Sequence, residues 1–325
     1  MVFFIFTRLV NGMLKFYKSA NNTICEVDGW EVDCWINVTA PEDVELEFLK
    51  NTLAIDPMFL TAAADEEESS RTEISDNGEQ ILVVIDTPYA QRQGEHSVVY
   101  TTMPLGVIVT KQNIITISLR ENAVIKELTD SMVKGVNTQF KTRFLFIILY
   151  RIAIRFLQHL KQIDRIENLL EQELRNSMRN KELLHLLEIE KSLVYFSTSL
   201  KANQITIERI LRGRVLKIYE EDQDLLEDVL TEIKQGVDMS NIYSGIVTTT
   251  MNSYSSIISN NLNAAMKFLT SMTILLAIPT MISSFYGMNV KLPVDGDYAF
   301  LCLIVLSLLL TFTSYFILKQ KDLLS

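Results

Sequence analysis

Two stretches near the C-terminus contain no charged residue, and this feature constrains the fold of the chain more than any other. They are residues 268–286, FLTSMTILLAIPTMISSFY, and residues 298–318, YAFLCLIVLSLLLTFTSYFIL. A helix of about 20 apolar residues has the length needed to cross the hydrocarbon core of a bilayer. We therefore predict two transmembrane helices joined by a short loop, residues 287–297.

Lysines near the ends of these segments predict their orientation. Lys267 precedes the first segment, and Lys319 and Lys321 follow the second, whereas the connecting loop has Lys291 beside two aspartates. Short flanks that carry more lysine and arginine remain on the cytosolic side. Both termini are therefore expected in the cytosol, with the loop outside the cell (inner) membrane and residues 319–325 forming a basic cytosolic tail.

The charge balance and the scarce metal-binding residue types narrow the function. The chain has 40 acidic against 30 basic residues, a formal net charge of −10 at pH 7. This balance argues against nucleic acid as a partner and favours cations. The three cysteines and three histidines show no spacing typical of a disulfide scaffold or a metal site. No catalytic constellation stands at a recognisable spacing either, so we do not expect an enzyme.

Residues 1–120 are expected to form a cytosolic α/β domain. Short apolar or alternating runs are separated there by turn-forming residues, a pattern typical of a sheet. The predicted strands are residues 2–6, 13–16, 35–38, 81–85, 98–100, 106–109 and 114–117. Residues 44–54 and 57–64 have helical character.

A long region without proline, residues 105–278, predicts long helices. We expect a cytosolic helical region over residues 121–237, followed by a stalk helix over residues 238–286 that continues into the first membrane segment. The predicted fold class is thus an α+β or α/β N-terminal domain, long helices and two C-terminal transmembrane helices.

Residues 144–160 are also strongly apolar and could be mistaken for a third membrane segment. Arg151 and Arg155 stand in their middle, and the uncharged run before them is too short to cross a bilayer. We interpret this stretch as a buried amphipathic helix.

The first membrane segment carries a stripe of polar and small residues. Steps of three and four residues connect Asn263, Met266, Thr270, Thr273, Ala277, Thr280, Ser284 and Gly287. Such a seam faces a partner helix or a symmetry axis. The stripe alone leaves two interpretations open, a water-filled pore or close helix packing. Two helices cannot enclose a pore, so a channel built from this chain must be an oligomer.

The first segment ends in Tyr286-Gly287-Met288-Asn289, and this motif resembles the signature of the CorA family of magnesium and cobalt channels. The stretch 225–289 is similar to that family, and the similarity is carried by Asn263, Met266, Lys267, Leu269, Pro279 and Thr280. The N-terminal half resembles the family only in size, in its α/β pattern and in residues 35–37. The resemblance implies a funnel-shaped homopentamer with a pore lined by the first membrane helix.

The resemblance also implies roles for individual residues. Gly287, Met288 and Asn289 would form the selectivity filter, with the Asn289 carbonyl binding the water shell of Mg²⁺ rather than the bare ion. The implied pore-lining residues are Asn263, Met266, Leu269, Thr273, Ala277, Thr280 and Ser284. Mg²⁺ is the expected transported ion, and its use as a regulatory ligand is open.

Two features depart from the family pattern. Where the family has an acidic regulatory residue on the stalk, this chain has the neutral Asn252. The loop after the motif reads VKLPVDGD and is less acidic than in some members. Six acidic residues between 220 and 228 could concentrate cations, but we interpret them as a solvated helix start favoured by the helix dipole.

Three functions are compatible with these observations. The leading hypothesis is passive uptake of Mg²⁺, with Co²⁺ and Ni²⁺ as further candidates, driven by the membrane potential, because no nucleotide-binding motif supplies energy. The second is a Zn²⁺ or proton-coupled transporter, as in the related ZntB branch. The third is a non-conducting, membrane-tethered sensing or structural protein.

Overall fold

The computed structural model describes residues 14–20, 23–93, 97–130, 132–133, 135–176, 180–213, 215–288, 298–321 and 323. The chain divides into two compact units, Met1–Thr249 and Thr250–Ser325. The helices are α2 (Asp43–Asn51), α3 (Pro57–Ala63), α4 (Ala123–Thr129), α5 (Lys141–Asn176), α6 (Asn180–Leu211), α7 (Glu220–Tyr286) and α8 (Ala299–Gln320). The helix α7 contributes residues to both units.

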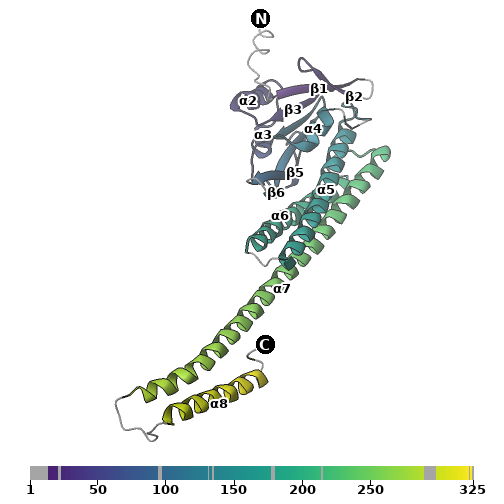
Figure 1. Ribbon diagram of the computed structural model, residues 1–325. Helices are drawn as coiled ribbons and strands as arrows, with labels where there is room; N and C mark the ends of the chain where they lie inside the picture. Colours follow the sequence, from purple (N-terminus) through teal and green to yellow (C-terminus); the bar gives the residue numbers. More distant parts are fainter. Residues whose placement is uncertain are drawn as a thin grey trace. The chain divides into compact units, whose positions relative to one another are not determined.

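The first unit is built on a seven-stranded sheet with the strand order β2-β1-β3-β7-β6-β5-β4 (Figure 1). The strands are β1 (Leu14–Ala20), β2 (Thr23–Val27), β3 (Trp35–Thr39), β4 (Arg71–Ile74), β5 (Gln80–Gln93), β6 (Ser97–Thr110) and β7 (Ile114–Ser118). β3 and β7 are parallel, and the other neighbouring strands are antiparallel. The strand predicted for residues 2–6 lies outside the described residues.

The runs at residues 98–100 and 106–109 belong to one strand, so our prediction of two separate strands is wrong. β6 pairs with β5 along its whole length, and Pro104 stands opposite Asp86. Pairing of β6 with β7 begins only at Leu105. Pro104 therefore lies where, among the described residues, β6 has a strand partner on one side. A proline fits such a position because it has no amide proton to donate on the other side.

Helices cover both faces of the sheet, because successive residues of a strand point to opposite sides. On one face, Ile36 of β3 packs in a core with Phe59 and Leu60 of α3. On the other face, Trp35 is fully buried and its ring lies 5.2 Å from the ring of Phe144 in α5. The α/β character expected for the N-terminal domain is confirmed.

Close packing between α3 and the sheet makes Gly106 a sensitive position. A Cβ atom at Gly106 would lie 2.4 Å from the Cβ atom and 3.0 Å from the Cα atom of Ala63. We expect Gly106→Ala to lower the free energy of unfolding by about 1–3 kcal/mol, because a backbone must move to relieve this clash. Thermal unfolding of the purified chain measures the change. Gly29→Ala is the matched control, since nothing lies within 4 Å of its added methyl group.

A second substitution separates the clash from a general effect of removing a strand glycine. Ala63→Gly removes the methyl group that the new side chain meets, so the double variant should recover part of the lost stability. A Gly106→Ala protein as stable as the wild type would contradict this account of the packing.

The apolar stretch at residues 144–160 is a buried part of α5, as predicted. Phe144, Phe156 and Leu160 are fully buried. The two arginines of this stretch bind one carboxylate in α4: Nε of Arg151 donates to Oε2 of Glu127 at 3.0 Å, and Arg155 reaches Oε1 of Glu127 at 3.2 Å. Paired charges of this kind belong to a protein interior rather than to lipid.

The helix α7 begins at Glu220, which corrects the predicted start at residue 238. Acidic residues occupy its first turn, where the helix dipole favours negative charge. One of them, Asp222, is buried and accepts a hydrogen bond from Nη1 of Arg143 at 2.8 Å. Gly236 does not interrupt the helix, because it lies against the side chain of Leu200 in α6, where a Cβ atom would meet Leu200 at 3.2 Å. Pro279 also lies inside α7.

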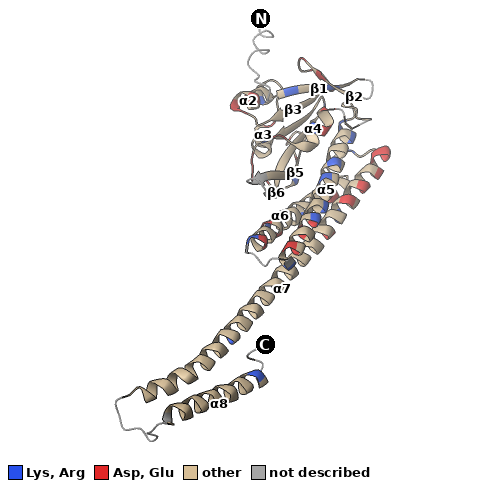
Figure 2. Ribbon diagram, in the orientation of Figure 1, with Lys and Arg blue, Asp and Glu red and all other residues tan. Residues whose placement is uncertain are grey.

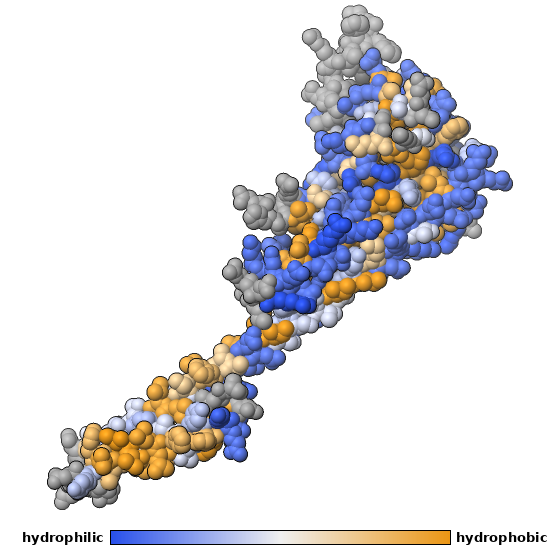
Figure 3. Space-filling view, turned by 45° about the vertical axis from the view of Figure 1, so that its right-hand side comes forward, coloured by the Kyte–Doolittle hydropathy of each residue, from blue (hydrophilic) through white to orange (hydrophobic). Residues whose placement is uncertain are grey.

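The second unit consists of the C-terminal part of α7 together with α8, which lie side by side (Figure 1). Both helices are long and apolar enough to cross a membrane, and only 6% of the most apolar stretch of each is buried. Figure 3 shows hydrophobic residues gathered over the surface of this unit. Such a surface needs lipid or other protein chains around it.

Candidate functional site

The predicted pore-lining residues of α7 are all exposed in the single chain. Met266 and Leu269 expose 58% and 67% of their surface. The others are Asn263, Thr273, Ala277, Thr280 and Ser284. The predicted filter residues Gly287 and Met288 lie just beyond the end of the helix and are exposed as well. Asn289, the predicted ion-binding residue, lies outside the described residues.

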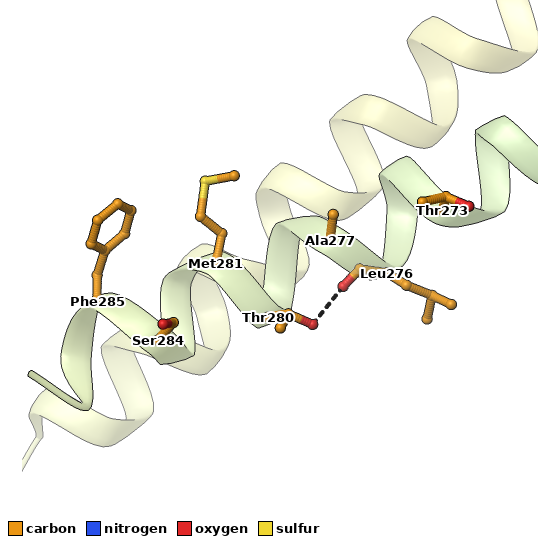
Figure 4. A pocket seen from close by; sticks show the side chains of 7 residues that line it. All are labelled: Thr273, Leu276, Ala277, Thr280, Met281, Ser284 and Phe285. Carbon is orange, nitrogen blue, oxygen red and sulfur yellow. Dashed lines mark hydrogen bonds between the residues drawn. The ribbon is translucent and has the colours of Figure 1, made fainter.

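The structure brings four of these residues together along an open groove on α7. Thr273, Ala277, Thr280 and Ser284 line it, with Leu276, Met281 and Phe285 beside them (Figure 4). Those three apolar residues were not among the predicted pore-lining residues. They follow from the same helical spacing once the stripe is widened by one residue on each side.

The threonine hydroxyl groups of the groove have their protons engaged within α7. Oγ1 of Thr280 donates to the carbonyl of Leu276 at 2.8 Å (Figure 4), and Oγ1 of Thr273 donates to the carbonyl of Leu269 at 2.8 Å. A hydroxyl group has one proton and two lone pairs. Each oxygen is therefore left to accept hydrogen bonds from the groove, which suits the water shell of a cation.

The C-terminal end of α7, at the Tyr286-Gly287-Met288 motif, is closed by hydrogen bonds to carbonyls three and four residues earlier. The amide of Gly287 donates to the carbonyls of both Ser283 and Ser284, at 3.0 and 3.2 Å, and the amide of Met288 donates to Phe285 at 3.4 Å. A Cβ atom at Gly287 would meet its nearest neighbours at 3.5 Å, an ordinary contact distance. The fold of one chain therefore leaves room for a side chain at Gly287.

The regulatory position that the resemblance implies is neutral and exposed. Asn252 lies on the surface of α7, and its carbonyl accepts a hydrogen bond from Ser256 at 3.0 Å. Within the described parts of the chain, no group of three or more His, Cys, Asp or Glu side chains could hold a metal ion. The acidic residues at 220–228 do begin a helix, as we interpreted them, but Asp222 among them is buried and paired with Arg143 rather than solvated.

One partly buried carboxylate in the first unit, that of Asp86, lies where α6 is attached to β5. Burial raises the pKa of Asp86 above its usual value, and a hydrogen bond from Ser199 acts in the opposite direction. The amide of Asp86 donates to Oδ1 of Asn203 at 3.0 Å, and Nδ2 of Asn203 donates back to the Asp86 carbonyl at 2.9 Å. These bonds attach α6 to β5.

Comparisons with known proteins agree on one family. Residues 30–320 match the family described as CorA-like Mg2+ transporter protein. The cobalt/magnesium transport protein CorA of Methanocaldococcus jannaschii is 28% identical over 265 residues, which cover 78% of this chain and 79% of that protein.

Solved structures show the same fold. The complete structure of the CorA magnesium transporter from Methanocaldococcus jannaschii matches with a TM-score of 0.79 and 24% identity, covering 95% of this chain and 98% of that one. The full-length CmaX protein matches with a TM-score of 0.73 and 13% identity, covering 96% and 100%. The ZntB cytoplasmic domain from Vibrio parahaemolyticus matches with a TM-score of 0.61 and 9% identity, covering 77% and 99%.

The matched region contains both uncharged segments and most of the α/β domain. The predicted fold class, an N-terminal α/β domain followed by long helices and apolar C-terminal helices, is confirmed by the likeness to the complete CorA structure. The family consists of membrane transporters rather than enzymes. This chain therefore belongs to the CorA-like Mg2+ transporter family and is a membrane transporter of divalent cations.

Proposed function

We propose that this protein conducts Mg²⁺ into the cell through the central pore of a homopentamer, in the direction of the electrochemical gradient. The observation that carries the proposal is the groove on α7, where Thr273 and Thr280 present acceptor oxygens while their protons are bound within the helix. Mg²⁺ releases its waters reluctantly, so a surface of neutral acceptors can hold the hydrated ion and let it pass.

The residues act in sequence along the helix. At the outer end, Asn289 carbonyls with Gly287 and Met288 would select the hydrated ion. Thr280 lies six residues before Tyr286, the last residue of α7, which is about 9 Å along the helix axis at about 1.5 Å per residue. The narrow section at Ala277 and Thr273 follows.

The inner part of the proposed pore is apolar. Leu269 and Met266 would form a constriction that closes by excluding water. Asn263 forms the cytosolic mouth. Co²⁺ and Ni²⁺ carry the same charge and would follow the same route where their water shells are held in the same way.

Assembly follows from the exposure of the second unit. Two helices with such small buried fractions cannot enclose a path for water. Several copies around an axis would cover the groove side of α7, and α8 would face lipid. We place the protein in the cell (inner) membrane with both termini in the cytosol. Lysines lie at the ends of the two segments that are away from the connecting loop, and flanks rich in lysine remain on the cytosolic side.

Proton coupling has little support in these segments. Residues 268–286 and 298–318 contain no Asp, Glu, His, Lys or Arg. Proton pathways through membranes use chains of such titratable groups. The likeness to the ZntB domain concerns the fold of the cytoplasmic part.

Flux into liposomes that contain the purified protein tests the proposal. We expect rapid Mg²⁺ influx, reported by an entrapped dye, under an inside-negative potential and without a pH gradient. Zn²⁺ influx that requires a pH gradient would instead support a ZntB-type transporter. Absence of flux for all four ions under either gradient would support a sensing or structural protein.

A further inference from the structure

Among the described residues of the second unit, the charged side chains gather at one end of its two helices. Between residues 239 and 290, Lys267 is the only charged residue. In α8 the only charged residue is Lys319, near the C-terminal end, and Lys321 follows directly after the helix. Figure 2 shows this part of α7 almost entirely in tan, and basic residues at the end of α8.

A hydrogen bond between α7 and the segment after α8 holds these lysines at the same end of the two helices. Oγ of Ser271 on α7 is almost completely buried and donates to the carbonyl of Leu323, after the end of α8, at 2.8 Å. Lys267 precedes Ser271 by four residues and therefore lies on the same face of α7, about one turn away. Lys321 precedes Leu323 by two residues, and the amide of Leu323 donates back to Leu318 at 3.1 Å. The C-terminal tail is thus attached to α7 beside Lys267.

The three lysines have no acidic partner among the described residues. Lys267, Lys319 and Lys321 are exposed, and within the described ranges no carboxylate lies within 4.0 Å of their Nζ atoms. Asp322, the only acidic residue in the sequence after Asp297, lies outside the described residues. The cluster therefore presents positive charge that remains available to an anion.

Apolar side chains lie next to the cluster on the membrane side. Phe268 and Met272 on α7 expose 55% and 40% of their surface, and Phe316 and Ile317 on α8 expose 54% and 50%. A phospholipid needs this combination, because its phosphate requires cations and its acyl chains require an apolar wall. A free phosphate ion would use the lysines alone.

We propose that Lys267, Lys319 and Lys321 form a binding site for the phosphate headgroup of an anionic phospholipid in the cytosolic leaflet. The lipid would lie against the end of α8 and the attached tail. This inference depends on the membrane placement of the two helices and does not depend on which cation is transported.

Native mass spectrometry of the purified full-length oligomer tests the site. The probes are phosphatidylglycerol and phosphatidylcholine with identical acyl chains. We expect the wild-type protein to retain phosphatidylglycerol preferentially. The triple variant Lys267→Gln, Lys319→Gln, Lys321→Gln should lose about tenfold or more of this preference, since each lysine near a membrane surface contributes about fivefold in affinity.

A control with the same change of net charge distinguishes a local site from a general charge effect. It replaces the exposed lysines Lys126, Lys191 and Lys201 of the first unit with glutamine. This control should keep the preference, as should Lys→Arg replacements at the three site positions. Inorganic phosphate should not displace the lipid.

Three outcomes would overturn the proposal. One is a site variant that keeps its preference for phosphatidylglycerol, and another is an equal loss in the control. The third is displacement of the lipid by millimolar phosphate. The oligomer mass in the same spectra shows whether the site variant is assembled. If it is not, the three single Lys→Gln variants are compared, each with an expected loss of about fivefold.

Discussion

Alanine at position 289 is expected to reduce Mg²⁺ influx by about a hundredfold or more. Each side-chain carbonyl of Asn289 would accept a hydrogen bond from the water shell of the ion, and one hydrogen bond contributes about 0.5–1.5 kcal/mol. In a ring of identical copies the loss is repeated in every subunit, so several kcal/mol of ion binding disappear together. The measurement is dye-reported influx into liposomes at equal protein content.

Aspartate at the same position tests whether ion binding that is too tight also lowers the flux. Asn289→Asp keeps the shape and adds a negative charge in each copy, so Mg²⁺ should bind more tightly and leave more slowly. We expect lower flux with stronger block of monovalent leak by Mg²⁺. Asn168→Ala on α5 is the matched control, because this asparagine is exposed and, within the described residues, its side chain bonds only to the carbonyl of Asp164 in its own helix. Unchanged influx in Asn289→Ala would remove position 289 from the filter.

Leucine at position 277 is expected to abolish flux while leaving the oligomer intact. Ala277 lies in the groove between Thr273 and Thr280. A larger apolar side chain there, repeated in each copy, would narrow the proposed pore and exclude water from it. The loss of influx should exceed about a hundredfold, because a dewetted constriction is a barrier to a hydrated ion.

The same variant separates the two interpretations of the polar stripe. If the stripe packs tightly against a neighbouring helix, leucine at 277 would force the helices apart and the oligomer would dissociate. Flux and the mass of the detergent-purified particle are therefore measured together. Lost flux at unchanged mass supports a pore, and lost mass supports packing. Cys302→Leu on the exposed surface of α8 is the control and should alter neither.

Sequence patterns predicted the elements whose residues lie in one clearly defined environment, either lipid or the protein core. The uncharged segments could be recognised because lipid tolerates almost no charge, and the buried part of α5 because Arg151 and Arg155 exclude a membrane. The strands β2 and β4 were missed because edge strands are short and carry polar residues, as in Arg71–Ile74. The helix start expected at residues 220–228 and the stalk helix expected from residue 238 are one helix, and this continuity, with Gly236 packed against Leu200, could be seen only in the structure.

In the candidate site, too, some features could be predicted from the sequence and others could not. Helical spacing placed Thr273, Ala277 and Thr280 on one side of α7, and the groove in the structure contains them. That the hydroxyl protons of Thr273 and Thr280 are bound within the helix could be seen only in the structure. The role of Asn289 rests on the motif, since no periodicity indicates which residue beyond the end of a helix binds an ion.

Because the two membrane segments carry no charge, the membrane potential can act on the transported ion without acting on the helices that would open and close its path. A membrane potential of 100 mV does about 2.3 kcal/mol of work on each unit charge that crosses the bilayer. In this protein the segments at 268–286 and 298–318 offer the field no charge to move, and Lys267 stands at their border. A divalent ion in the proposed pore would carry two charges through the field, while the helices around it would have no charge on which the field could act. Voltage should therefore set how fast ions pass without setting how often the pore is open.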